Sequence, residues 1–159
     1  MMDDVRSALN LPPCCQVGFV YPDLEAAIKL FEPLFGEFKI VSYGPTEGAL
    51  YRGKPEPYEL RMGIAYTGDL ELELIEWVSG KTPHKEFLDA GKTGMQHLSF
   101  TVEDLDDVVE RAKPLGFEAI WYHAMSDEIK YAYLERKDDP VLIELTQRPW
   151  SGGNVQLDE

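Results

Sequence analysis

The chain has 159 residues, 44% of them hydrophobic, which is enough for one domain with a substantial core and excludes a largely disordered protein. Its formal net charge of −14 argues against nucleic acid or a membrane as a partner, because phosphate groups would be repelled. We expect no signal peptide, no membrane-spanning segment and no disulfide between the adjacent Cys14 and Cys15, and therefore a cytoplasmic protein.

Residues 1–13 are interpreted as an N-terminal arm, and the first unit of the domain follows them. The segment "QVGFVYPDLEAAIKLFEPLFG" (16–36) predicts an alternating strand and then an amphipathic helix. Asp23 suits the N-cap of this helix, since its carboxylate can accept the free amide hydrogens of the first turn. The predicted buried stripe of the helix consists of Ala27, Leu30 and Leu34.

Three further strands complete the first unit. Residues 37–43 and 59–66 are strand candidates, and the Gly- and Pro-rich segment 43–58 between them predicts a long loop. The last strand is "LELELIEW" (70–77), in which the leucines are expected to cover the helix. Each unit is therefore expected to have the order strand, helix and three strands.

A second unit repeats the first at an offset of 81 residues. In "HLSFTVEDLDDVVERAKPLGF" (97–117), His97 falls on Gln16 and Asp104 falls on Asp23. Strand candidates follow at 117–123, 129–135 and in "VLIELTQ" (141–147). The predicted organisation is a single domain, 14–147, with module one at 14–78, a linker at 79–94 that carries a short helix, module two at 95–147 and a flexible tail at 148–159.

The alternation of the strands puts four polar side chains on the concave side, away from the helices. Each module supplies one of them from its first strand and one from its last: Gln16, Glu73, His97 and Glu144. Buried carboxylates are costly without partners, and a divalent cation is a suitable partner for two carboxylates, an imidazole and an amide oxygen. The alternative is that the two glutamates pair with surface bases and that Gln16 is an ordinary hydrogen-bonding strand residue. Glu71 and Glu76 are expected to be ordinary acids.

The segments "QVGFVYPDLEAAI", "LELIEW", "GMQHLSFTVEDLDDVV" and "DDPVLIELTQ" resemble the vicinal oxygen chelate superfamily, which includes glyoxalase, bleomycin-resistance and extradiol dioxygenase proteins. The resemblance implies an α+β fold in which two βαβββ modules form a cup-shaped open barrel around one divalent metal ion. The ligands that it implies are Gln16, Glu73, His97 and Glu144, similar to the set of zinc-type glyoxalase I. Gln16 departs from the set of two His and one Glu of the extradiol dioxygenases.

The function implied by the resemblance is that of a metal-dependent lyase or isomerase. Such an enzyme would transfer a proton next to a metal-bound carbonyl, in the manner of glyoxalase I or of a 2-methylacyl-CoA epimerase, with Glu144 and Glu73 as the candidate bases. The metal is left open among Zn, Ni, Co, Mn and Mg, the substrate is a small molecule with a carbonyl, and a homodimer is expected. The alternative is a metal-free small-molecule binding protein of the bleomycin-resistance type.

Several aromatic residues either line the cup or belong to the core. They are Phe38, Tyr43, Tyr51, Trp121, Tyr122, Tyr131 and Tyr133. His84 and His123 are weaker site candidates, because neither has a matching residue in the other module.

Overall fold

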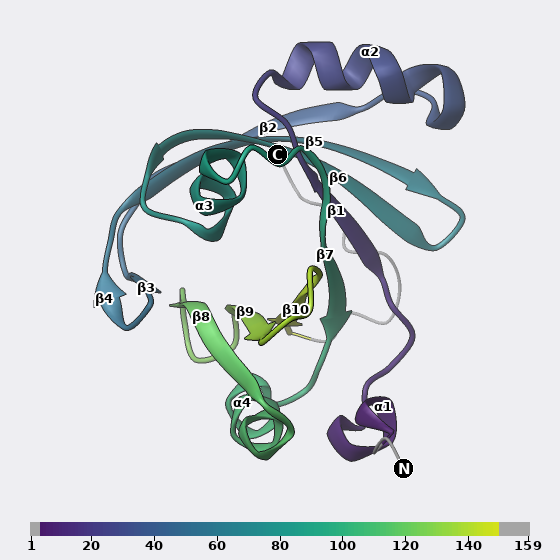
Figure 1. Cartoon of the computed structure of the whole chain (residues 1–159). Coiled ribbons are helices and arrows are strands. Elements are labelled where there is room, and N and C mark those ends of the chain that lie inside the picture. The colour runs from purple at the N-terminus through teal and green to yellow at the C-terminus, as the bar shows by residue number, and fades with distance from the viewer. Residues whose placement is uncertain (1–3, 150–159) are drawn as a thin grey trace.

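The structure, a computed structural model, describes residues 4–149. Most of the tail predicted for 148–159 therefore lies outside the described residues. In the described part of the chain, a mixed ten-stranded sheet curls into a half-barrel that α2 and α4 cover from outside (Figure 1). This is the α+β cup expected from the sequence.

Both modules have the predicted order of elements. The first consists of β1 (Gln16–Val20), α2 (Leu24–Phe35), β2 (Lys39–Thr46), β5 (Tyr58–Thr67) and β6 (Leu70–Gly80). The second consists of β7 (Gly94–Thr101), α4 (Leu105–Ala112), a 3₁₀ turn (Lys113–Leu115), β8 (Phe117–Ala124), β9 (Lys130–Arg136) and β10 (Leu142–Gln147). The remaining elements are α1 (Val5–Leu9), β3 (Ala49–Tyr51), β4 (Lys54–Pro55) and α3 (Pro83–Asp89).

The first strands of the two modules meet at the centre of the sheet. The strand order is β2-β5-β6-β1-β7-β10-β9-β8-β3-β4, in which β1 and β7 are antiparallel. Each of these first strands also pairs in parallel with the last strand of its own module, β6 or β10. The four strands that carry the predicted site residues are therefore neighbours.

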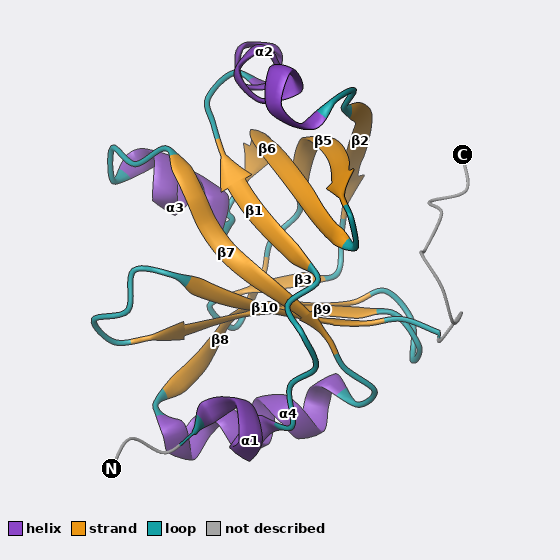
Figure 2. Cartoon of the chain, turned by 90° about the vertical axis from the view of Figure 1, so that its right-hand side faces the viewer, coloured by secondary structure: helices purple, strands orange, loops and turns teal. Residues whose placement is uncertain are grey.

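The two module helices begin where the sequence predicts. The side chain of Asp23 accepts a hydrogen bond from the amide of Ala26 at 3.0 Å, and Asp104 accepts one from the amide of Asp107 at 3.1 Å. Both carboxylates thus satisfy first-turn amides that have no partner within the helix. Figure 2 shows α2 at one end of the strand layer and α1 with α4 at the other.

The predicted buried stripe of α2 was wrong. The helix buries Leu24, Ala27 and Ile28 against β5 and β6, with Phe31 and Phe35 packed beside them. In contrast, the predicted stripe members Leu30 and Leu34 are 66% and 74% exposed. Two apolar stripes share Ala27, and the one that carries the aromatic rings faces the sheet because it buries more apolar area.

The long loop predicted for 43–58 was also wrong. It contains β3 and β4, and β3 pairs with the second module through Ala49 opposite His123 and Tyr51 opposite Trp121. This β-hairpin arm crosses from the first module to the free edge of β8, whose backbone groups would otherwise lack partners. It helps to close the cup around the concave side.

The helices of the described region are too short or too polar to cross a lipid bilayer.

Candidate metal centre

His97 lies at the centre of the cup, on β7, where this strand pairs with β1. Gly18 is its partner across the two strands, and the imidazole ring rests against this glycine. A Cβ atom at Gly18 would lie 2.0 Å from Cε1 of His97, so any side chain there would displace the ring. The glycine of "QVGFV" thus makes room for the imidazole.

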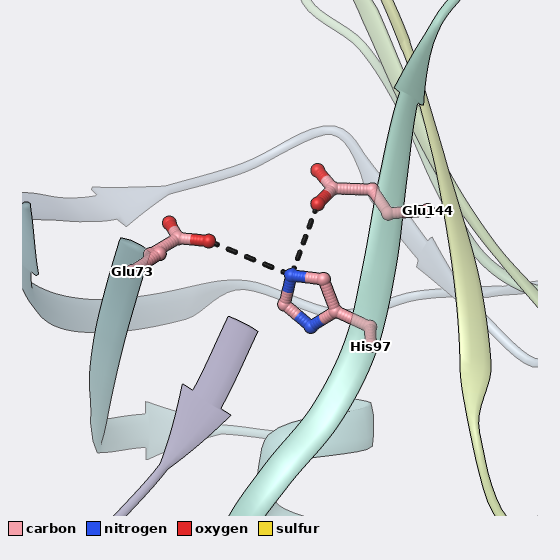
Figure 3. A group of neighbouring side chains, drawn as sticks. All are labelled: Glu73, His97 and Glu144. Atoms are coloured by element: carbon pink, nitrogen blue, oxygen red, sulfur yellow. Dashed lines mark ion pairs between the residues drawn. The ribbon is translucent and has the colours of Figure 1, made fainter. Parts of the chain in front are cut away.

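Three oxygen atoms from the other predicted site residues surround one nitrogen of His97. Its Nε2 lies 3.1 Å from Oε2 of Glu144, 3.5 Å from Oε2 of Glu73 and 3.3 Å from Oε1 of Gln16. Figure 3 shows the two glutamates approaching the ring from different strands. All four residues are buried. The structure therefore brings together the complete set that the repeat predicted.

The burial of these charges shifts their pKa values. Burial alone would lower the pKa of His97, but the two nearby carboxylates of Glu144 and Glu73 outweigh it and raise that pKa to about 9. For Glu73, burial raises the pKa, His97 opposes this shift, and Glu144 adds to it by like-charge repulsion. The site is thus a cluster of two buried acids around the imidazolium of His97, and the guanidinium of Arg148 adds a weaker positive charge.

The donor set fits a divalent metal ion. Oε2 of Glu144 is buried and, despite its short distance to His97, has no partner in hydrogen-bonding geometry among the described residues. Carboxylate and amide oxygens with one imidazole nitrogen are ligands common to Zn²⁺, Mn²⁺, Co²⁺ and Ni²⁺. Glu73, His97 and Glu144 also place one ligand atom each within 4.8 Å of one another. These observations make the cluster a candidate metal centre.

Glu71 orients the amide of Gln16, so its expected role as an ordinary acid was wrong. Nε2 of Gln16 donates to Oε2 of Glu71, which leaves Oε1 of Gln16 directed at His97. Tyr66 donates to the other carboxylate oxygen of Glu71 at 2.9 Å. Burial, together with repulsion from Glu73, raises the pKa of Glu71. The alternation of β6 places Glu71 and Glu73 on the same face, which was the available signal for this role.

Glu76 has a structural role outside the site. Its side chain accepts a hydrogen bond from the amide of Leu24 at 2.7 Å and pairs with Arg61 at 3.2 Å. It therefore supports the start of α2.

A cavity of about 130 Å³ opens above the candidate metal centre. Its floor contains Gln16, Glu73 and Glu144, and its walls are mainly apolar and aromatic. Of the seven aromatic residues considered from the sequence, four line the cavity: Tyr43, Trp121, Tyr131 and Tyr133. The other three, Phe38, Tyr51 and Tyr122, pack in or against the hydrophobic clusters instead. Tyr58, which sequence reasoning missed, also lines the cavity.

The two weaker histidine candidates have different positions. His123 lines the cavity, and its Nδ1 lies 3.1 Å from the hydroxyl of Tyr58. His84 is fully buried in α3, with Nε2 3.0 Å from the hydroxyl of Tyr133, and burial lowers its pKa to about 3. Neither belongs to the cluster around His97.

Arg148 is a cationic residue that lines the cavity, and sequence reasoning placed it in the tail. Its guanidinium carbon lies 5.6 Å from the centre of the Tyr131 ring. It follows directly after β10, so its position depends on the strand that carries Glu144.

Gly18→Ala should disturb the candidate metal centre without replacing any of its four ligands. The new methyl group would force the His97 ring from its place, at an expected cost of roughly 1–3 kcal/mol in stability and with weaker metal binding. Gly63→Ala is the matched control, because the atoms nearest to a Cβ there would be the side-chain ends of Ile28 and Leu24 of α2, at 3.3 Å or more. Thermal unfolding and zinc titration measure both effects. Metal binding by Gly18→Ala equal to that of the parent would contradict this account of the glycine.

Comparison with known proteins agrees with the fold. A family model described as the glyoxalase/bleomycin resistance protein/dioxygenase superfamily matches residues 15–133, most of the chain. The chain belongs to this superfamily. The resemblance inferred from the four sequence segments is thereby confirmed.

Solved structures show the same superfamily fold at low sequence identity. A hypothetical protein from Bacillus halodurans is 16% identical with a TM-score of 0.61, and the match covers 89% of this chain and 97% of that one. Methylmalonyl-CoA epimerase from Mycobacterium tuberculosis is 20% identical with a TM-score of 0.58, covering 87% and 89%. A Streptomyces coelicolor methylmalonyl-CoA epimerase variant in complex with 2-nitronate-propionyl-CoA is 19% identical with a TM-score of 0.60, covering 87% and 95%. No curated protein matches the sequence.

Proposed function

We propose that this member of the glyoxalase superfamily is a metal-dependent lyase or isomerase that transfers a proton at the carbon next to a carbonyl group. The observation that carries the proposal is the position of Glu73 and Glu144. These two buried carboxylates come from different modules, flank Nε2 of His97 and both face the cavity.

Gln16, Glu73, His97 and Glu144 are the residues that would hold the metal ion. A bound divalent cation supplies Lewis acidity, which stabilises negative charge on a carbonyl oxygen. The hydrogen bond from Gln16 to Glu71 orients the Gln16 amide, so its oxygen could bind a metal ion without rearrangement. The site thus has a supporting group of the kind that orients metal ligands in proteins.

Glu73 and Glu144 are the candidates for moving the proton. They stand on β6 and β10, which flank the central pair β1 and β7 on opposite sides. A substrate between them would present one face to each carboxylate. Burial also raises the pKa of Glu73, which brings it closer to the value suited to a base that works near neutral pH. This arrangement supports either removal and return of a proton at one carbon or its transfer to a neighbouring carbon.

The cavity walls suit a substrate with an apolar part next to its carbonyl. Tyr43, Tyr58, Trp121 and Tyr133 surround the floor with aromatic surface, which excludes water from the reacting atoms. The epimerases among the structural neighbours are named for methylmalonyl-CoA, a thioester with a methyl group on the carbon next to its carbonyl. The resemblance to glyoxalase I adds adducts of 2-oxo-aldehydes as a second compound class. These two compound classes are the substrates to test first.

The test is hydrogen exchange in deuterated water with a panel of both compound classes. Protein reconstituted with zinc, cobalt, nickel, manganese or magnesium should introduce deuterium at the carbon next to the carbonyl of at least one compound. Protein treated with a chelator should not. Exchange that is equally fast without metal, or absent for every compound with every metal, would overturn the proposal.

A metal-free binding protein is the second candidate, and the mainly apolar lining of the cavity favours it. Tight binding of an apolar ligand to chelator-treated protein, together with no exchange on the whole panel, would replace the enzyme proposal with this one.

We also expect a homodimer. Leu30 and Leu34 lie on the outer face of α2 and are mostly exposed, and paired apolar side chains of this size favour burial in an interface. Sedimentation velocity should show a dimer in the micromolar range, and Leu30→Glu combined with Leu34→Glu should shift it toward monomer. A parent protein that remains monomeric at high micromolar concentration would contradict the expectation.

A further inference from the structure

A bulge in the central strand pair places an additional polar side chain behind the candidate metal centre. Gly18 of β1 faces His97 of β7, but the next residue, Phe19, faces Met95, so Gln96 is an extra residue on β7. In a regular strand, neighbouring side chains point to opposite faces. The bulge breaks this rule and allows Gln96 and His97 to contact each other through their side chains.

The surroundings of Gln96 determine how its amide is turned. The side chain is buried, and Nε2 donates to the backbone carbonyl of Pro83, in the first turn of α3, at 3.1 Å. A carbonyl oxygen can only accept a hydrogen bond, so the NH₂ group must face Pro83. The amide oxygen, Oε1, therefore faces Nδ1 of His97, at 3.0 Å.

This orientation has a consequence for the imidazole. An amide oxygen is also only an acceptor, so Nδ1 of His97 must carry the hydrogen in that bond. Nε2, on the other side of the ring, faces only oxygen atoms of Gln16, Glu73 and Glu144, so it also has acceptors for a hydrogen until a metal ion takes that position. We propose that Gln96 is a positioning residue that holds a hydrogen of His97 on Nδ1 and so presents Nε2 to a metal ion. The proposal rests on the metal site of the proposed function, but the hydrogen bond from Nδ1 of His97 to Gln96 stands on contacts within the chain.

The same side chain connects the metal centre to α3. Pro83 begins this helix, whose Phe87 and Leu88 pack against the aromatic cluster on the concave side. Removal of the Gln96 amide would leave the Pro83 carbonyl and the Nδ1–H group of His97 buried without these partners. Loss of an outer hydrogen-bond partner of a metal-bound histidine typically weakens metal binding roughly 10- to 100-fold.

Three variants distinguish the hydrogen-bonding role of Gln96 from its contribution to packing. In Gln96→Met, the new side chain has about the length of glutamine but lacks both the amide oxygen and the NH₂ group. The zinc affinity of this variant should therefore fall roughly 10- to 100-fold. Gln96→Glu, when its carboxyl is protonated, retains an acceptor for His97 and a donor for Pro83 and should recover most of that loss. Gln147→Met is the matched control, because it also removes a glutamine that hydrogen-bonds to backbone groups, those of Leu105 and Asp127, but contacts none of the four candidate ligands through these bonds. Its zinc affinity should equal that of the parent.

Nitrogen NMR of histidine-labelled protein reads the tautomer directly. In the zinc-loaded parent, we expect a slowly exchanging Nδ1–H signal from His97 and zinc on Nε2, and in Gln96→Met rapid exchange of that proton. In the metal-free parent, the Nδ1–H signal of His97 should also exchange slowly, and in metal-free Gln96→Met it should exchange rapidly. Zinc bound through Nδ1 instead of Nε2, or equal zinc affinities for Gln96→Met and the parent, would overturn the inference. A parent that binds no zinc but keeps a slowly exchanging Nδ1–H signal, lost in Gln96→Met, would overturn the proposed function and leave the hydrogen bond between His97 and Gln96 supported.

Discussion

Glu144→Gln should retain divalent metal and exchange the proton next to the carbonyl roughly 100- to 10,000-fold more slowly than the parent, the range expected for loss of a general base. The amide has nearly the shape of the carboxylate, so it can still offer an oxygen at the position of Oε2, close to Nε2 of His97. It cannot accept the substrate proton. The measurement is deuterium exchange at saturating metal, with metal content determined on the same samples.

Glu118→Gln is the control for this prediction. Glu118 is an exposed acid on β8, and its substitution by Gln changes the net charge by the same amount as Glu144→Gln. Its exchange rate should match that of the parent. If Glu144→Gln binds metal fully and exchanges at the parent rate, Glu144 is not the base, and Glu73→Gln then becomes the decisive variant.

His97→Ala should reduce metal affinity more strongly than any change in the outer partners, by well over the roughly 100-fold upper range for such partners. The substitution removes the single nitrogen around which Gln16, Glu73 and Glu144 converge. His84→Ala is the control, since it removes another fully buried imidazole that lies outside the cluster. A general loss of stability would affect both variants, whereas the loss of metal binding should be confined to His97→Ala.

The pH dependence of metal binding gives a second test of whether His97 binds the metal ion. The metal-free site holds a proton on His97 with a pKa of about 9, well above the ordinary value, and this proton must leave when Nε2 binds a metal ion. Apparent affinity should therefore rise roughly tenfold per pH unit from neutral pH up to about 9 and level off above it. Calorimetry in buffers of different ionisation enthalpy should show about one proton released per metal ion bound near pH 7.5. An affinity that is independent of pH in this range would contradict the arrangement.

The candidate ligands could be predicted from the sequence because they depend on two simple regularities. Strand alternation placed Glu73 opposite the leucines of β6, and the repeat aligned His97 with Gln16. Both the alternation and the repeat hold at these positions of the structure, because β1 and β7 are neighbours and each pairs with the last strand of its own module. The metal centre itself remains a prediction, but the meeting of its four residues is observed.

The features that were missed depend on contacts between distant segments. The arm that contains β3 forms a strand because it pairs with the edge of β8, and the local sequence of 43–58 does not indicate this distant partner. Gln96 reaches the site only because a bulge interrupts the alternation from which its direction would be inferred. In α2, two apolar stripes were available, and the choice between them depended on which side chains fit the sheet.

A crystal structure of the metal-reconstituted protein, with anomalous scattering recorded at the absorption edge of the metal, would show directly whether the four residues bind a metal ion. We expect one anomalous peak per chain at the floor of the cavity, with Nε2 of His97 and side-chain oxygens of Gln16, Glu73 and Glu144 about 2.0–2.2 Å from it, as for a first-row ion such as zinc. A fully occupied metal site elsewhere, or no peak at the floor while these four side chains keep the positions described above, would contradict it.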